Sequence, residues 1–261
     1  MQDRIIKSIL FTITILLISN LALAQQNKTD EQGRKQGAWV KYKDGVKAYE
    51  GQFVDDVPVG EFLRYFRSGR LLSKSQYSAG GTRCFVEFFY DQRKSKTKAK
   101  GLYVNQVKDS LWLLYNDLGV LIAEETYEDG LASGLWKLYA YNGVLASETP
   151  YQLDQLHGIK KEYFDNGHLK REMSFQNDAL QGSFKVYFPK GQLRTGGQFE
   201  MGMKAGIWVY YLMDGQLWFK ETYEEGMMIE RVDTEGEPYE LPLVQDSVRV
   251  DFDPDKIMDM K

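Results

Sequence analysis

The stretch Gly134-Leu135-Trp136-Lys137-Leu138-Tyr139 decides the fold, because related stretches recur along the chain at steps of about 24 residues. Related hexapeptides begin at Gly37, Gly60, Ser110, Gly158, Gly182 and Gly206, and a degenerate copy has Cys84 in the glycine position and Phe89 in the tyrosine position. Self-similarity at a fixed period indicates a repeat architecture. The sequence therefore predicts eight units over residues 37–226.

Each unit has a second half with its own pattern. A second glycine follows the first by nine residues in most units, a leucine follows two residues later, and an aromatic residue follows six beyond that. A turn-forming residue often precedes the second glycine, as in Asn142-Gly143, Asn166-Gly167 and Asp214-Gly215. Two short β-forming runs on either side of an Asn-Gly or Asp-Gly pair predict a β-hairpin. We therefore expect one hairpin in each unit.

A single hairpin is marginally stable alone, so the units must stack side by side. Stacking produces two columns of side chains. One column holds Trp39, Phe62, Val86, Trp112, Trp136, Phe184 and Trp208, with an interruption at Lys160, and the other holds Tyr42, Tyr65, Tyr115, Tyr139, Tyr163, Tyr187 and Tyr211. Within a unit the two residues are three apart, so they lie on opposite faces or a bulge realigns them.

The predicted fold class is all-β: an elongated array of about eight stacked hairpins that forms a continuous antiparallel meander. Sixteen strands at ~4.8 Å spacing give a ribbon of roughly 75 Å. We interpret the aromatic columns as the contacts that join neighbouring units, and not as a box around a ligand. A flat ribbon of this kind offers no cleft for a reaction.

The composition is ordinary for a globular protein. The chain has 261 residues, of which 43% are hydrophobic and 27% charged, with 33 Lys+Arg against 37 Asp+Glu, a formal net charge of −4. A nucleic-acid surface would need a concentrated basic face, so the mild acidity argues against a nucleic-acid partner.

Residues 1–24 have the pattern of a secretory signal peptide. Arg4 and Lys7 precede an uncharged, strongly apolar stretch, and Ala22-Leu23-Ala24 is a cleavage site. No cysteine follows the apolar run, so a bacterial lipoprotein anchor is excluded. We expect an exported protein in the periplasm, on the outer surface or outside the cell; the alternative is a retained anchor, which normally needs ~20 apolar residues.

The sequence shows no recognisable catalytic, metal or cofactor motif. His157 and His168 fall in turns that the repeat dictates, and no spacing of cysteine or histidine suits zinc. No nucleophile elbow or phosphate-binding loop appears. Cys84 cannot form an internal disulfide and is interpreted as a small buried residue, with a reactive thiol as the alternative. We expect no enzyme, no metal and no cofactor.

Adjacent carboxylates such as Glu124-Glu125 and Glu224-Glu225 could be drawn as acid/base pairs. Neighbouring residues on a strand point to opposite faces, so we expect solvated surface groups instead. A carbohydrate-active enzyme would need clustered carboxylates in a cleft.

The degenerate unit carries the one candidate binding site. In the stretch Arg93-Lys94-Ser95-Lys96-Thr97-Lys98-Ala99-Lys100, four lysines stand at every second position and would form a positive stripe on a strand. The candidate residues are Arg93, Lys94, Lys96, Lys98 and Lys100. They could dock an anionic envelope polymer or an acidic protein, or they could form a charged edge that blocks aggregation.

The two ends of the array depart from the template. Residues 25–36 are polar and are expected to form a flexible leader. Residues 227–261 are expected to form a C-terminal cap and a loose tail, in which the alternating run Val244–Phe252 would be a last capping strand. Asp253-Pro254-Asp255 would end that strand.

The template resembles MORN repeats, and more closely the bacterial MORN-variant repeats. The resemblance is clearest in Tyr127-Glu128-Asp129-Gly130, which leads to Gly134-Leu135-Trp136, in Leu156-His157-Gly158, and over residues 163–169. It implies an elongated hairpin array used for protein or membrane association, and some bacterial members carry an antitoxin label. Lipid-headgroup binding would call for basic patches, whereas this chain is net acidic.

We therefore expect an exported, non-enzymatic repeat protein that binds or scaffolds a protein or an envelope component. The alternative is an antitoxin-like or immunity-like protein that masks a toxin partner. The sequence leaves open which face binds, the oligomeric state and the identity of the ligand.

Overall fold

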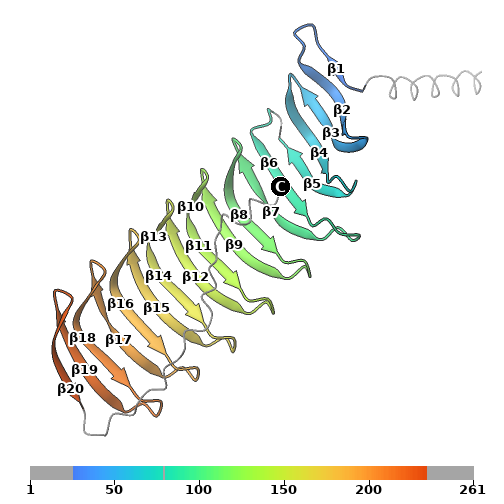
Figure 1. Cartoon of the computed structure of the whole chain (residues 1–261). Coiled ribbons are helices and arrows are strands. Elements are labelled where there is room, and N and C mark those ends of the chain that lie inside the picture. Colours follow the sequence, from blue (N-terminus) through green and yellow to red (C-terminus); the bar gives the residue numbers. More distant parts are fainter. Residues whose placement is uncertain (1–25, 79, 234–261) are drawn as a thin grey trace, which may run out of the picture.

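The computed structural model describes residues 26–78 and 80–233, which form one open antiparallel sheet of twenty strands. The hairpins follow one another along a ribbon from β1 to β20 (Figure 1). The strands are β1 (Lys28–Thr29), β2 (Lys35–Lys43), β3 (Val46–Val54), β4 (Val57–Tyr65), β5 (Leu71–Tyr77), β6 (Arg83–Phe89), β7 (Thr97–Val104), β8 (Val107–Tyr115), β9 (Leu121–Glu128), β10 (Leu131–Ala132), β11 (Gly134–Tyr139), β12 (Leu145–Gln152), β13 (Gln155–Leu156), β14 (Gly158–Tyr163), β15 (Leu169–Gln176), β16 (Ala179–Tyr187), β17 (Leu193–Glu200), β18 (Met203–Tyr211), β19 (Leu217–Glu224) and β20 (Met227–Asp233). The predicted all-β hairpin meander is confirmed.

Eight complete hairpins make up the array, from β2/β3 to β18/β19. Strands β10 and β11 are two halves of one strand interrupted at Ser133, and β13 and β14 are halves interrupted at His157. Strands β1 and β20 add one further strand at each end of the sheet. The predicted signal peptide over residues 1–24 and the predicted capping strand over residues 244–252 lie outside the described residues.

Two kinds of turn alternate along the array. Except between β5 and β6, which are separated by residues 78–82, the links between units are two-residue turns. Both residues of these turns have positive φ, for example 49° at Asn177 and 67° at Asp178. These values are typical of the type I′ turns that match the twist of paired strands. At the Asn-Gly sites the loop is longer: Phe164 N donates to His168 O, Gly167 N donates to Phe164 O, and only the glycine has positive φ. The tightest hairpins therefore lie in the links and not at the Asn-Gly pairs.

The tryptophan and tyrosine columns lie on opposite faces of the sheet. Trp136 contacts the rings of Tyr127 and Tyr151, whereas the Tyr139 hydroxyl donates to Glu124 on the other face. A bulge follows each long turn, as where Tyr139 pairs with Leu145 while Leu138 pairs with Ser147. The extra residue, Ala146, lies on the partner strand, so the bulge does not realign the tyrosine. We call the two surfaces the ring face, which carries the tryptophan column, and the tyrosine face.

The core runs along the ring face. Trp112 is 2% exposed and packs with Cys84 and Val86, so the predicted burial of Cys84 is confirmed. The indole N–H of Trp112 donates to Leu102 O at 3.1 Å, and that of Trp208 donates to Gln198 O at 3.2 Å. Each ring thus bonds to the preceding strand while it packs against aromatic neighbours, which confirms the aromatic columns as contacts between units.

The N-terminal segment differs from the flexible leader that we expected. Strand β1 pairs with β2, with Lys28 opposite Gln36, and Lys28 O accepts the indole N–H of Trp39 at 3.0 Å. This segment therefore supplies the first tryptophan with the preceding strand that later tryptophans find in the unit before them. The polar composition of this segment did not predict that it would contact Trp39, because the contact is made by a backbone carbonyl and not by a side chain.

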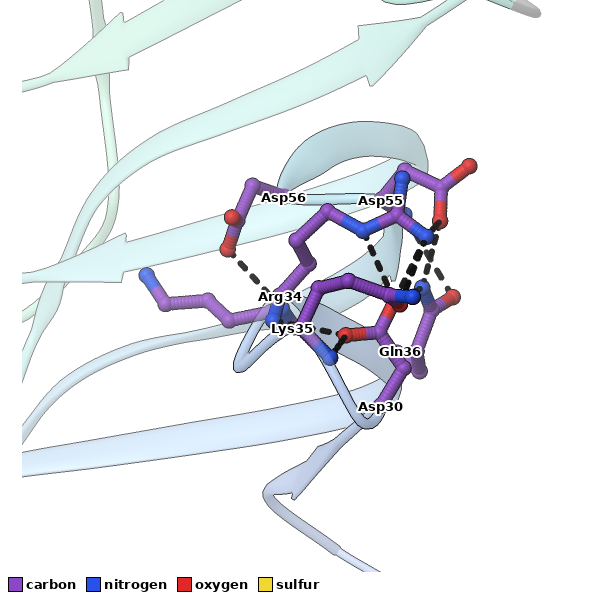
Figure 2. Close-up of polar contacts among 7 residues, drawn as sticks. Asp30, Arg34, Lys35, Gln36, Asp55 and Asp56 are labelled. Carbon is purple, nitrogen blue, oxygen red and sulfur yellow. Dashed lines mark hydrogen bonds and ion pairs between the residues drawn. The ribbon is translucent and has the colours of Figure 1, made fainter.

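A network of polar side chains closes this N-terminal segment onto the first link turn (Figure 2). Arg34 Nη2 lies 2.7 Å from Asp30 Oδ2 and 3.0 Å from Asp55 Oδ1. Gln36 Nε2 also donates to Asp55 Oδ1, at 2.6 Å. These exposed contacts join β1, β2 and the turn between β3 and β4, and they contribute modestly because solvent screens them.

The link turns also bond to the unit before them. Asp178 N donates to Leu156 O at 3.1 Å, and Asp178 Oδ1 accepts from Leu156 N at 2.8 Å. Asp56 with Lys35 and Asp154 with Ala132 repeat both bonds. We call this arrangement the aspartate clamp. It adds two hydrogen bonds between neighbouring units beyond those of the strand ladder.

Candidate functional site

The tyrosine face is tied together by hydrogen bonds between successive units. The Tyr139 hydroxyl donates to Glu124 Oε1 at 2.6 Å, and the Tyr163 hydroxyl donates to Glu148 Oε2 at 2.7 Å. Tyr65 and Glu50 form the same pair. Partial burial, followed by the hydrogen bond to Glu124, raises the pKa of Tyr139 to about 12. These tyrosines are held in place as structural groups.

A line of exposed apolar side chains runs along the tyrosine face. Each member directly follows the unit-opening position and precedes the tryptophan column by one residue, so it points away from the ring face. The members are Phe85, Leu111, Leu135, Ile159 and Ile207, with exposed fractions between 43% and 61%, and we call them the apolar row. Glu61 and Ser183 occupy the same position in two other units.

Sequence reasoning missed the apolar row, although a signal was present. A large apolar residue follows the unit-opening position in five units, but the repeated glycine and tryptophan on either side of it form the more obvious pattern. Successive hairpins advance by two strand spacings, so row members of adjacent units lie roughly 10 Å apart. Aligned apolar groups that remain exposed are typical of an interaction surface.

The lysine-rich stretch does not form one straight stripe. Only Lys98 and Lys100 lie on β7, while Arg93, Lys94 and Lys96 lie in the loop before it. A bulge at this point pairs Phe89 with Thr97 and Phe88 with Ala99, which breaks the alternation that a stripe requires.

Three of the lysines have partners within the chain. Lys96 Nζ donates to Asp117 O at 2.8 Å. Lys98 Nζ lies 5.8 Å from the centre of the Tyr90 ring, and Lys100 Nζ lies 5.6 Å from that of Tyr115. Lys96 and Lys100 therefore contact the neighbouring β8/β9 hairpin, whereas Lys98 lies over a tyrosine of its own hairpin.

Our expectation that adjacent carboxylates are solvated is wrong for Glu125. Glu124 and Glu125 do point to opposite faces, but Glu125 is only 8% exposed on the ring face. It accepts from the Tyr127 hydroxyl at 2.7 Å and from Lys108 Nζ at 3.3 Å. Burial and the hydrogen bond to Glu125 raise the pKa of Tyr127 above its usual range.

The same group of side chains recurs four units later. Glu221 accepts from the Tyr223 hydroxyl at 2.9 Å, and Lys204 Nζ lies 3.7 Å from Glu221 Oε2 and 4.4 Å from the centre of the Trp208 ring. In both copies a lysine lies over the tryptophan and neutralises the carboxylate. The buried Glu125 and the half-buried Glu221 are thus internal ion-pair partners of the fold.

The ribbon is not flat throughout. A surface hollow of about 790 Å³ lies on the side of the longer turns in the last hairpins, and we call it the terminal hollow. Tyr210 stacks on Phe219 with ring centres 4.2 Å apart, and Trp218 also lines the hollow. Its charged residues are Arg194, Asp214 and Arg231. A hollow with one carboxylate lacks the pair that glycoside hydrolysis uses.

His168 lies in the loop between β14 and β15, as predicted, whereas His157 lies at the break between β13 and β14 and not in a turn. His157 Nδ1 lies 3.4 Å from Asn177 Oδ1, and His168 Nδ1 donates to Pro189 O at 2.7 Å. Among residues 26–78 and 80–233, no three His, Cys, Asp or Glu side chains gather as a metal site. No helix in this part of the chain has the length and apolar character to cross a membrane.

The geometry defines a class of protein: an open repeat array whose hairpins contact only their neighbours. The family model for the MORN repeat variant matches residues 132–153 and 156–177, two adjacent units in the middle of the array. The chain therefore contains MORN-variant repeats over residues 132–177. No curated protein matches it.

Proposed function

We propose that the chain is a non-catalytic scaffold that binds a protein partner through the apolar row. MORN repeats are generally modules that bind proteins or membranes. The observation that carries the proposal is the alignment of Leu111, Leu135 and Ile159, three exposed aliphatic side chains in three consecutive hairpins. A rigid sheet holds them at fixed spacing, so a partner would not have to order them on binding.

The charges beside the row favour a protein partner over an anionic lipid surface. Lys137 Nζ lies 3.7 Å from Glu124 Oε2, and Lys185 Nζ lies 3.9 Å from Glu172 Oε2. Paired charges of this kind leave little net positive potential for lipid headgroups, which attract clusters of unpaired lysine and arginine. The apolar side chains are then the main source of binding free energy.

The signal-peptide pattern of residues 1–24 supports a site of binding in the cell envelope or outside the cell, and the partner would then be an envelope protein. An antitoxin or immunity role would use the same row to cover a toxin. Loss of the chain would then be toxic to the producing cell, whereas deletion without toxicity would count against that alternative.

The experiment is capture from an envelope extract with the purified chain, with the captured protein identified and its affinity then measured. We expect Leu111→Glu together with Leu135→Glu to weaken binding by at least tenfold, since each buried leucine contributes about 1.5–3 kcal/mol. Ser183→Glu is the matched control, because Ser183 holds the same template position without an apolar side chain. Equal binding by the row variant would refute the proposal.

A second variant tests the lysine-rich stretch. Changing Lys94, Lys96, Lys98 and Lys100 to Glu would abolish capture if an anionic partner docked there. We expect this variant to retain the partner of the apolar row. Loss of capture with an intact row would move the binding site to the degenerate unit.

A further inference from the structure

The last described strand leaves an edge open. β20 pairs with β19 on one side and with no other strand of residues 26–78 and 80–233. All seven of its residues are exposed, including Met227, Met228, Ile229 and Val232. An exposed apolar edge promotes association with other chains, and a repeat array needs its final unit covered. Something must therefore cover β20.

The terminal hollow beside this edge has its own chemical preference. Arg231 lies over the Phe219 ring at 4.0 Å, and Arg194 lies over the Phe188 ring at 5.9 Å. No carboxylate of the described residues forms an ion pair with Arg194, and Asp214 is the single acidic residue in the lining. Arg231 Nε pairs with Asp233 Oδ1 at 2.8 Å, which leaves Arg194 as the guanidinium group open to an acidic partner. An aromatic floor beneath this group suits a peptide that is both apolar and acidic.

The chain itself continues from this point with such a peptide. Asp233, the last residue of β20, pairs with Phe219 in the floor of the hollow. The 28 residues from 234 to 261 contain eight Asp and Glu against three Lys and Arg, a net charge of −5. Their apolar residues include Tyr239, Leu241, Leu243 and Phe252.

We propose that the C-terminal segment, residues 234–261, binds in the terminal hollow and along the free edge of β20, and so closes the end of the array. Tethering favours this occupant, because a segment attached at Asp233 has an effective concentration on the order of millimolar at the hollow. This inference is independent of the apolar row, which lies on the opposite face, so either proposal can fail alone.

Hydrogen exchange followed by mass spectrometry on the whole chain tests the proposal. We expect amides of residues 234–261 to exchange at least about tenfold more slowly than in a free peptide of the same sequence. Arg194→Glu together with Arg231→Glu should return them to the free-peptide rate. Lys170→Glu is the matched control, because Lys170 lies over Phe164 one unit earlier as Arg194 lies over Phe188.

A second variant avoids any change to the folded array. Changing Glu235, Glu237 and Glu240 to Gln should also raise exchange in the segment if charge complementarity holds it. Free-peptide rates in the unmodified chain would overturn the proposal. A dimer in light scattering whose interface protects β20 while residues 234–261 exchange freely would also overturn it, since a second copy would then be the occupant.

Discussion

Gly197 lies directly beneath the indole ring of Trp208: a Cβ atom built on Gly197 would be 2.3 Å from Cδ2 of that ring. Gly101 stands in the same relation to Trp112, and Gly51 to Phe62. In these three units the large ring lies over a residue without a side chain on the strand before it, whereas Phe184 is opposite Met173. The glycine permits the ring to lie against the backbone of the preceding unit.

Gly197→Ala should lower the free energy of unfolding by about 2–3 kcal/mol, because the added methyl group would force the indole out of its position. Gly196→Ala should change it by less than about 1 kcal/mol, since a Cβ there meets only ordinary contacts and the substitution restricts the unfolded chain. Urea denaturation of both variants measures the difference. Equal effects would show that the sheet moves freely enough to absorb the methyl group.

The tyrosine–glutamate pairs predict a loss of stability in alkali. The pKa of Tyr65, Tyr139 and Tyr163 is raised to about 12 by partial burial and then by the hydrogen bond to glutamate. The unfolded chain releases these protons near pH 10. Their contribution is therefore complete below about pH 10 and is lost as the pH rises to about 12.

Replacing all three of these tyrosines with phenylalanine should flatten the decline of stability between pH 10 and 12, as measured by urea titrations at several pH values. Tyr141→Phe serves as the control, because Tyr141 is 63% exposed in a turn. An unchanged slope in the triple variant would mean that the hydroxyl–carboxylate bonds contribute nothing to the pH dependence.

The aspartate clamp predicts different effects for two neighbouring residues of one link turn. Leu153 and Asp154 both have positive φ, at 49° and 69°, but only Asp154 bonds to Ala132. Asp154→Ala should destabilise the chain by about 1–2 kcal/mol, since a backbone N–H loses its partner. Leu153→Ala, an exposed change at a similar φ, should cost less than about 0.5 kcal/mol by thermal melting. The reverse order would exclude the clamp as a contact between units.

The burial of Cys84 predicts that its thiol reacts slowly in the folded chain. Cys84 is 7% exposed in the folded chain. Its reaction with a thiol reagent such as Ellman's reagent should be at least about a hundredfold slower in the folded chain than in the urea-unfolded chain, because the native structure must open first. The absorbance of the released thiolate gives both rates. Rapid reaction of the folded chain would instead support the reactive-thiol interpretation.

The sequence by itself determined the period, the number of hairpins and the sites of their turns. Each depends on chemistry within a few residues: glycine in left-handed turns such as Gly143 and Gly167, and aromatic residues at a repeated spacing. Such local preferences reappear in every unit, so eight imperfect copies reinforce one another. The match to the MORN repeat variant falls on two of these units, over residues 132–177.

Tertiary structure alone decided how the side chains are distributed. Sequence spacing did not decide whether Trp136 and Tyr139 lie on the same face of the sheet. It also predicted that Glu125 is a surface group, although the fold buries this residue. The spacing of the lysines predicted one continuous stripe, but the bulge near Lys98 interrupts it. These outcomes depend on bulges and on contacts with the neighbouring hairpin, and stacking alone creates the apolar row and the terminal hollow. A repeat pattern records what each unit contains, whereas function depends on what stacking leaves uncovered.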